Sequence, residues 1–347
     1  MFVSLNDQKI NYAGRIDWKE KEQPIFIFPA TSMEFNFYGR SAKLKIKNHG
    51  IDWINYAGAV VDGIEKKWEL PREGEIILDL VDEPKERKHK ILFFKRMDAC
   101  HEMQLCSLEL SEGSKMLEPN PIPKRRIEFY GDSVTAGEVS EAIEYAGKQD
   151  PVHHGQYSNS YGSYSWMTAR KLHAKIHNIA QGGIPLLNGT GWVDPPVYIG
   201  MEYMWDKLHY RERHGEAVEW DFSQYTPQLV VIAIGQNDSN PYDVMKKEPK
   251  GVKARQWKEK YKEFVLNIRK KYPRAVIILA TTILEHDENW DIAIDEVCNE
   301  INDDRIRHFL YSRNGCGTPG HIRIQEAEEM SDELVAYIEQ LDIPVWE

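Results

Sequence analysis

The chain has 347 residues, of which 41% are hydrophobic and 29% charged, a composition typical of a folded globular protein and not of a disordered one. This length is sufficient for one large domain or two ordinary ones. The formal net charge of −11 disfavours a general electrostatic attraction to nucleic acid or to an anionic membrane, so we expect neither as a partner.

The N-terminal segment, residues 1–23, has no basic start followed by an apolar run, so we expect no secretory signal. No apolar stretch approaches the roughly 20 residues needed to span a bilayer. The cysteines lack CxxC or Cys/His ligand spacing, which predicts reduced thiols, a cytoplasmic location, and no metal or cofactor. They are Cys100, Cys106, Cys298 and Cys316.

Short β-branched or aromatic runs, separated by Gly, Pro or Asn, follow one another at residues 24–30, 32–39, 42–48, 56–63, 74–81, 90–97 and 103–110. Several of them alternate apolar and polar residues, which indicates strands with one buried face. Roughly seven or eight such strands within about 110 residues predict an all-β jelly roll or sandwich over residues 1–118. The proline-rich segment after it predicts a linker at residues 119–125.

From residue 126 the pattern changes, and near-continuous apolar runs of strand length alternate with helical segments. This alternation predicts a parallel sheet covered by helices on both faces, hence an α/β domain over residues 126–347. Two long loops, 138–160 and 184–226, interrupt the pattern, and loops of that length in a compact domain are usually functional or disordered. The predicted strands are 127–130, 175–180, 228–235, 275–283 and 308–312, and the predicted helices are 160–174, 254–272, 289–302 and 323–341.

Polar or glycine-rich segments directly follow several of these strands. Ser133 follows the first, the Gly182-Gly183 turn the second and Asn237 the third, while His321 ends the loop after the last. Because ligands bind beyond the carboxyl ends of parallel strands, we expect these residues to converge on one edge of the sheet.

These residue types suit acyl transfer. A serine hydroxyl becomes a nucleophile when a neighbouring base removes its proton, and histidine titrates in the required range. The tetrahedral oxyanion needs fixed donors, which two backbone N–H groups and an asparagine amide can supply. Taken singly, the serine, the glycines and the asparagine are better explained as turn or cap residues, and His321 is only one of twelve histidines. Their order after successive strands favours the catalytic interpretation.

The same segments resemble the SGNH (GDSL-like) hydrolases, on the residues Gly131-Asp132-Ser133 with Thr135 and Gly137, and on the blocks NIAQGG and IGQND. With the β domain ahead of them, including FIFPATSMEFNFYG and YAGAVVDG, the chain looks like carbohydrate esterase family two. In that family a jelly-roll domain precedes an SGNH esterase that removes acetyl groups from plant polysaccharides. The resemblance covers nearly the whole chain and implies a flavodoxin-like parallel sheet flanked by helices.

The resemblance also implies roles for individual residues. Ser133 would attack the acetyl carbonyl, and His321 would act first as general base and then as general acid. The N–H groups of Ser133 and Gly183, with the Asn237 amide, would form the oxyanion hole, and Gly182 is the alternative to Gly183.

One position departs from the superfamily pattern. The aspartate that usually orients the histidine stands three residues before it, and here that residue is Thr318. Members of the resembled family can work with a Ser–His dyad in which a main-chain carbonyl takes the orienting role, so the missing aspartate does not exclude catalysis, and the sequence leaves open which group orients His321. His153 and His154, in the first long loop, are the competing candidates for the base.

Further residues are predicted to contribute to substrate binding. Asp132 and Asp238 are expected to brace their turns more than to react. The aromatic residues of the second long loop either form a platform for sugar rings or pack that loop against the β domain or a neighbouring subunit. The predicted substrate-binding residues are Asp132, Tyr161, Gly182, Trp192, Trp205 and Asp238.

We therefore expect a cytoplasmic serine esterase that removes O-acetyl groups from imported manno- or xylo-oligosaccharides through an acetyl-serine intermediate. One alternative is a lipid or thioester hydrolase on the same scaffold. Another is a carbohydrate-binding protein with an impaired hydrolase domain, which only the missing aspartate favours. The sequence makes no prediction about the oligomeric state.

Overall fold

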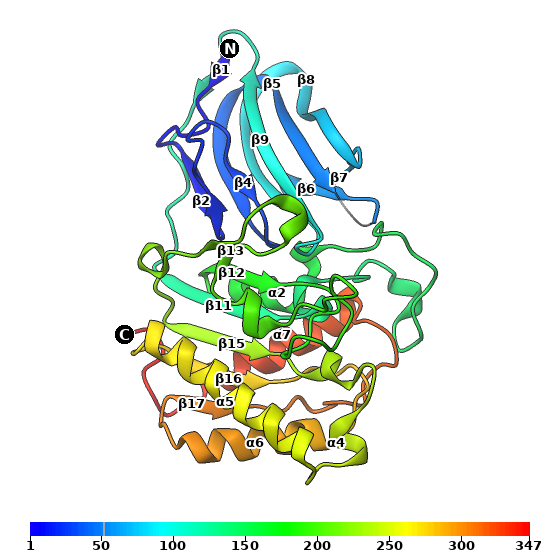
Figure 1. Cartoon of the computed structure of the whole chain (residues 1–347). Helices are drawn as coiled ribbons and strands as arrows, with labels where there is room; N and C mark the ends of the chain where they lie inside the picture. The colour runs from blue at the N-terminus through cyan, green and yellow to red at the C-terminus, as the bar shows by residue number, and fades with distance from the viewer. Residues whose placement is uncertain (51–52) are drawn as a thin grey trace.

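The computed structural model describes residues 1–50 and 53–347, which form two domains placed one above the other (Figure 1). The N-terminus lies at the outer end of the β domain, and the C-terminus lies on the α/β domain (Figure 1). The predicted fold class, a jelly-roll-like β domain followed by a helix-covered parallel sheet, is confirmed.

The β domain is one antiparallel sheet in the order β3-β4-β9-β5-β8-β6-β7, with β1 paired to β9 and with β2 and β10 paired to β5. It curves into a half-barrel around its own apolar core. The strands are β1 Phe2–Val3, β2 Ile10–Ala13, β3 Ile16–Asp17, β4 Ile25–Phe26, β5 Ser32–Gly50, β6 Tyr56–Val61, β7 Ile64–Glu69, β8 Glu73–Lys95, β9 His101–Leu110 and β10 Lys115–Met116.

Two of these strands are longer than the sequence runs predicted. The runs at 32–39 and 42–48 belong to the single strand β5, and those at 74–81 and 90–97 belong largely to β8. The register between β5 and β8 shifts near Gly39 and again near Ala42. Such irregularities bend a strand without ending it, so one strand can follow the curved sheet where the sequence suggested two.

The α/β domain contains a five-stranded parallel sheet in the order β12-β11-β15-β16-β17, the flavodoxin-like order. Its last strand ends at His308, earlier than the predicted 308–312, so that prediction is wrong in position. The strands are β11 Arg125–Gly131, β12 Ala174–Ala180, β15 Leu229–Ala233, β16 Val276–Ala280 and β17 Ile306–His308, with a separate pair β13 Lys207–His209 and β14 Val218–Glu219.

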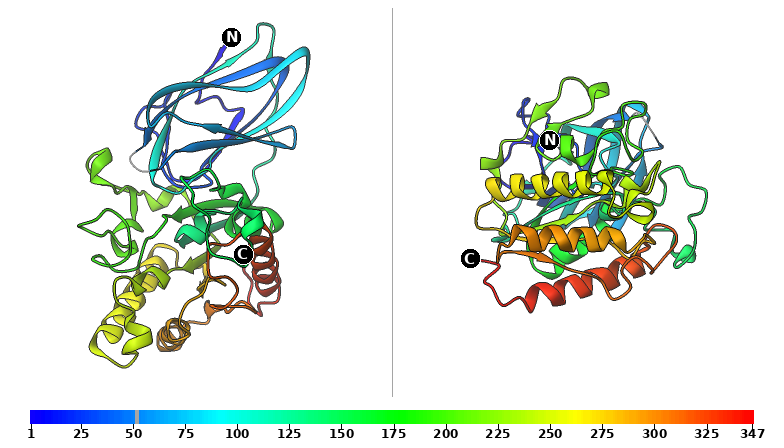
Figure 2. Two further views of the ribbon diagram at one scale, coloured as in Figure 1. Left: turned by 90° about the vertical axis from the view of Figure 1, so that its right-hand side faces the viewer. Right: turned by 60° about the horizontal axis from the view of Figure 1, so that its bottom comes forward.

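Helices cover both faces of the parallel sheet, because successive strand residues point to opposite sides and both sides are apolar. Ile232 packs in a core cluster with Trp257 of α5, and its neighbour Val231 packs in another with Leu334 of α7. Figure 2 shows α5 and α6 side by side. The helices are α1 Ser133–Ala136, α2 Tyr164–Lys171, α3 Met201–Met204, α4 Val244–Lys247, α5 Val252–Lys271, α6 Asn289–Ile301 and α7 Ile324–Glu339.

The two domains share buried contacts. Phe28 and Phe94 of the β domain belong to the core clusters of the α/β domain. Arg15, fully buried between β2 and β3, lies 3.3 Å from the Glu128 carboxylate and donates to the Tyr130 hydroxyl at 2.8 Å. This buried ion pair thus joins the β domain to the first strand of the parallel sheet.

No helix in the described part of the chain combines the length and apolar character that crossing a bilayer requires.

Candidate active site

The predicted nucleophile lies in a tight turn between β11 and α1. Asp132 caps α1 by accepting from the Val134 N–H at 3.0 Å. A Cβ on Gly131 would lie 2.1 Å from Oγ1 of Thr135, so only glycine permits this turn. Ser133 is the first residue of α1, and its backbone N–H therefore has no partner within the helix.

The glycine turn and Asn237 lie beside this serine. In a flavodoxin-like sheet the ligand crevice opens where the strand order reverses, here between β11 and β15. The Gly182-Gly183 turn follows β12, and Asn237 follows β15. The Asn237 amide nitrogen lies 3.2 Å from both Asp132 Oδ2 and the Ile184 carbonyl, which hold it at this edge.

His321 completes the group, and it is oriented by a carboxylate that the sequence did not reveal. Nδ1 of His321 lies 2.5 Å from Oδ2 of Asp150. Oδ1 of Asp150 accepts from the His321 N–H at 2.9 Å and from Arg323 at 2.8 Å. The Asp150 side chain therefore answers the question that Thr318 left open: it contacts Nδ1 of His321 and leaves Nε2 for proton transfer.

The protonation of this pair follows from its surroundings. Burial alone would lower the pKa of His321, but the hydrogen bond to Asp150 and the charge of Glu138 outweigh it and raise that pKa. Burial would raise the pKa of Asp150, yet its hydrogen bonds with His321 and Arg323 lower it. Burial also raises the pKa of Glu138 to about 7, which the neighbouring His321 opposes.

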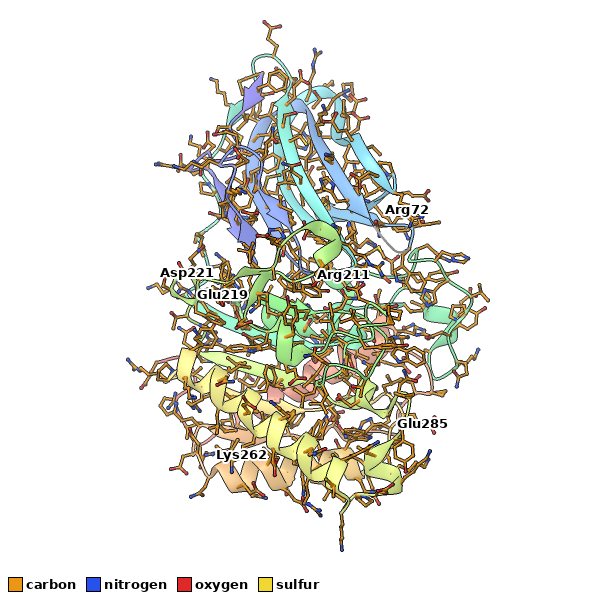
Figure 3. The ribbon with its side chains drawn as sticks, viewed as in Figure 1. Arg72, Arg211, Glu219, Asp221, Lys262 and Glu285 are labelled. Carbon is orange, nitrogen blue, oxygen red and sulfur yellow. The ribbon has the colours of Figure 1, made fainter. Side chains whose placement is uncertain are left out.

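Ser133, Gly183, Asn237 and His321 line one cavity of about 500 Å³. That volume lies within the range of roughly 300–1,000 Å³ usual for small-molecule sites. Arg211 lies where the two domains meet (Figure 3). The lining combines acidic, basic and aromatic side chains, among them Trp53, Asp98, Glu138, Trp192, Arg211 and Arg213.

The β domain contributes directly to this cavity. Asp98, which follows β8, accepts from the Gly182 N–H and from the Gln181 amide, both at 2.7 Å. The carboxylate therefore holds the glycine turn from the neighbouring domain. Asp98 belongs to no motif and lies far from the turn in the chain, so no sequence signal pointed to it.

Of the predicted substrate-binding residues, Gly182 and Trp192 line the cavity. The Trp192 N–H donates to the Gly183 carbonyl at 3.0 Å, and a Cβ on Gly183 would lie 2.8 Å from that of Trp192. Trp192 as a whole is 63% exposed and therefore accessible to a ligand.

The four other residues predicted to bind substrate do not line this cavity. Asp132 and Asp238 are buried, and Asp238 accepts from two backbone N–H groups after the glycine turn, so both brace the chain. Trp205 is buried in the core, and Tyr161 packs against Phe94 of the β domain. For Trp205, of the second long loop, this is the packing alternative that the sequence had left open.

The two histidines considered as competing bases lie outside the cavity lining. His153 stacks on Trp53, and burial lowers its pKa. Within residues 1–50 and 53–347 no group of three or more His, Cys, Asp or Glu side chains is arranged to hold a metal ion.

Comparison with known proteins agrees with this two-domain arrangement. Residues 12–120 match the family described as Carbohydrate esterase 2 N-terminal. Residues 129–307, more than half of the chain, match the GDSL-like Lipase/Acylhydrolase family. Fold and site together define an SGNH-class protein. The chain belongs to the GDSL-like lipase/acylhydrolase family of ester hydrolases, with the N-terminal domain of carbohydrate esterase family two.

Individual relatives cover most of the chain. Cellulase/esterase CelE of Acetivibrio thermocellus is 29% identical over 340 residues, which are 95% of this chain but only 39% of that protein. Acetylxylan esterase / glucomannan deacetylase of Cellvibrio japonicus is 23% identical over 346 residues, 98% of this chain and 90% of that protein. The structure of a family two carbohydrate esterase from Clostridium thermocellum in complex with cellohexaose has a TM-score of 0.78 at 28% identity, covering 95% of this chain and 98% of that one.

Proposed function

We propose that this protein is a serine esterase that removes O-acetyl groups from plant-derived manno- or xylo-oligosaccharides through an acetyl-serine intermediate. The observation that carries the proposal is the contact of Asp150 with Nδ1 of His321, in the cavity that also contains Ser133. An imidazole held in this way is a competent general base for a neighbouring hydroxyl.

In the acylation step, Oγ of Ser133 attacks the carbonyl carbon of the acetyl group while Nε2 of His321 takes the hydroxyl proton. The imidazolium formed is stabilised by the Asp150 carboxylate. The tetrahedral intermediate then collapses, the bond from the acetyl carbon to the sugar oxygen breaks, and His321 returns the proton to that oxygen. The sugar leaves as an alcohol, and the acetyl group remains on the serine.

In the deacylation step, water replaces the sugar. His321 removes a proton from the water as its oxygen attacks the acetyl-serine carbonyl, and then protonates Oγ of Ser133 as acetate leaves. Each turnover therefore consumes one ester and one water and yields one alcohol and one acetic acid. The chemistry requires no cofactor.

The oxyanion of both intermediates would be bound by the N–H groups of Ser133 and Gly183 and by the Asn237 amide. Asn237 now makes two long contacts of 3.2 Å within the protein, and the oxyanion would replace one of them. Asp98 fixes the Gly182 N–H, one residue before the glycine donor, so that little reorganisation is needed when charge develops.

The choice of substrate is supported by the relatives and by the cavity. One relative is named an acetylxylan esterase / glucomannan deacetylase, and a similar structure holds cellohexaose. A lining of carboxylates, guanidinium groups and indoles suits a polar molecule with flat apolar faces, such as a sugar. It does not suit the apolar acyl chain that a lipid hydrolase would bind, and the orienting Asp150 removes the one feature that favoured an impaired enzyme.

The decisive experiment compares Ser133→Ala with the wild type for acetate release from acetylated xylo- and manno-oligosaccharides. We expect a loss of about 10⁴-fold or more, because the nucleophile is removed. Ser223→Ala, at an exposed serine outside the cavity, should retain full activity. Equal acetate release by the wild type and Ser133→Ala would exclude the mechanism, and a strong preference for octanoyl over acetyl nitrophenyl esters would favour a lipid hydrolase.

A further inference from the structure

Two of the ten tryptophans are exposed, and both line the cavity that contains Ser133. Trp192 belongs to the long loop after the glycine turn, whereas Trp53 belongs to the β domain, between β5 and β6. Trp53 as a whole is 47% exposed. An indole in contact with solvent at the wall of a ligand cavity is available for stacking, and no motif in the sequence distinguished Trp53.

The Trp53 ring is held in place. It stacks on His153 with ring centroids 5.3 Å apart and an interplanar angle of 7°. The next residue, Ile54, donates its backbone N–H to the carbonyl of His154 at 3.0 Å. The β domain is thereby attached to the long loop that also carries Asp150. The imidazole of His153 thus covers one face of the indole.

The backbone conformation of Trp53 also supports a role in ligand binding. Its φ angle is +66°, a left-handed conformation found in only a few per cent of non-glycine residues. Such a conformation costs free energy and persists only where the surrounding contacts enforce it, and it concentrates at ligand sites. Here it coincides with the stacked ring and the cavity wall.

We propose that Trp53 is a stacking platform for a pyranose ring of the bound oligosaccharide, so that the β domain supplies a subsite of the active site. The inference rests on the proposed function, since it concerns the same substrate. The C–H face of a pyranose is apolar and flat and packs on an aromatic face. The hydroxyl groups at its edge would meet polar groups that line the same cavity, such as Arg211 and Arg213.

Binding provides the first test. In a Ser133→Ala background, which prevents turnover, the Kd of unacetylated and of acetylated mannotetraose is measured by calorimetry with and without Trp53→Ala. We expect Trp53→Ala to raise Kd about tenfold, equivalent to about 1.4 kcal/mol, because a stacked ring face is lost. Trp53→Phe, which keeps a smaller aromatic face, should retain part of the affinity. Tyr38→Ala, at an exposed aromatic residue of the β domain outside this cavity, is the matched control and should bind as the parent does.

Kinetics provide the second test. The ratio of kcat/KM for acetylated mannotetraose to kcat/KM for 4-nitrophenyl acetate is measured on one preparation, so it is independent of the folded fraction. We expect Trp53→Ala to lower this ratio about tenfold, mainly through KM for the tetrasaccharide. An unchanged ratio together with an unchanged Kd would overturn the platform and leave Trp53 a packing residue of the domain junction.

The two proposals fail in different ways. A wild type that binds mannotetraose through Trp53 but releases no acetate would overturn the proposed esterase function and leave the platform standing. A wild type that releases acetate while Trp53→Ala changes neither the ratio nor Kd would overturn the platform alone. Absence of any mannotetraose binding by Ser133→Ala would overturn the platform as well.

Discussion

The carboxyl edge of the parallel sheet and the segments that surround it contribute to the site in different ways. Ser133 and Asn237 enter the cavity directly from strand ends, and each is held by the hydrogen-bonded sheet behind it. Asp150, Asp98 and Trp53 come from a long loop and from the β domain. The sheet thus supplies groups that would react, and the surrounding segments supply groups that hold and extend them.

This difference has an energetic basis. The end of a strand is positioned by a ladder of backbone hydrogen bonds and by the packing of both apolar faces of the sheet, so its position does not depend on any single side chain. Asp150 is positioned by its contacts with His321 and Arg323. A substitution in the surrounding segments should therefore alter either the catalytic activity or the stability of the domain junction. Three such substitutions test this contrast between the sheet edge and the segments around it.

The largest effect is expected for Asp150→Asn, which removes the charge beside His321. Loss of the carboxylate should lower kcat/KM by about 10⁴-fold, because the imidazole loses its orientation and its charge partner. Because Asp150 raises the pKa of His321, its loss lowers that pKa, and the neutral base then persists to lower pH. The acidic limb of the pH–activity profile should move to lower pH. Glu144→Gln, at an exposed residue of the same loop, serves as the control. A small loss of kcat/KM in Asp150→Asn, with the acidic limb of its pH–activity profile unmoved, would contradict the role assigned to Asp150.

A smaller effect, on stability, is expected for Arg15→Met. The variant leaves the Glu128 carboxylate buried without its cation, which should lower the free energy of unfolding by about 3–5 kcal/mol. Urea denaturation measures this loss. The double variant Arg15→Met/Glu128→Gln should recover part of it, because no unpaired charge remains. Equal stability of Arg15→Met and wild type would mean that the ion pair does not join the domains.

The smallest effect is expected for Asp98→Asn. An amide at this position cannot accept from the Gly182 N–H, the Gln181 amide and the Cys100 N–H together, so the glycine turn should shift. We expect kcat for acetylated oligosaccharide to fall about tenfold with a smaller change in KM, since positioning of a transition-state donor is lost. Asp79→Asn, at an exposed residue of the same domain, is the control. A change confined to KM would instead make Asp98 a contact for the sugar.

Much of the fold was predictable from local pattern. Alternation within short runs indicated the β domain, and apolar strands alternating with amphipathic helices indicated the parallel sheet. The errors fall where tertiary structure overrides local signals. The bends of β5 are irregularities in a continuous ladder with β8, and the last parallel strand ends at His308, before the predicted apolar run is complete. Trp205 and Tyr161 looked available for sugar but fill space in the core and near the domain junction.

The sequence by itself determined that Ser133, the glycine turn and Asn237 follow successive strands, and parallel strands bring their carboxyl ends to one edge. Only the tertiary structure decided which side chain orients His321, which carboxylate holds the glycine turn, and that Trp53 lines the cavity. The periodicity of apolar residues indicates which face of a strand or helix is buried, but it does not indicate which distant residues that element contacts. Asp150 lies 171 residues from His321 in a loop without periodicity, so only the folded chain brings the two together.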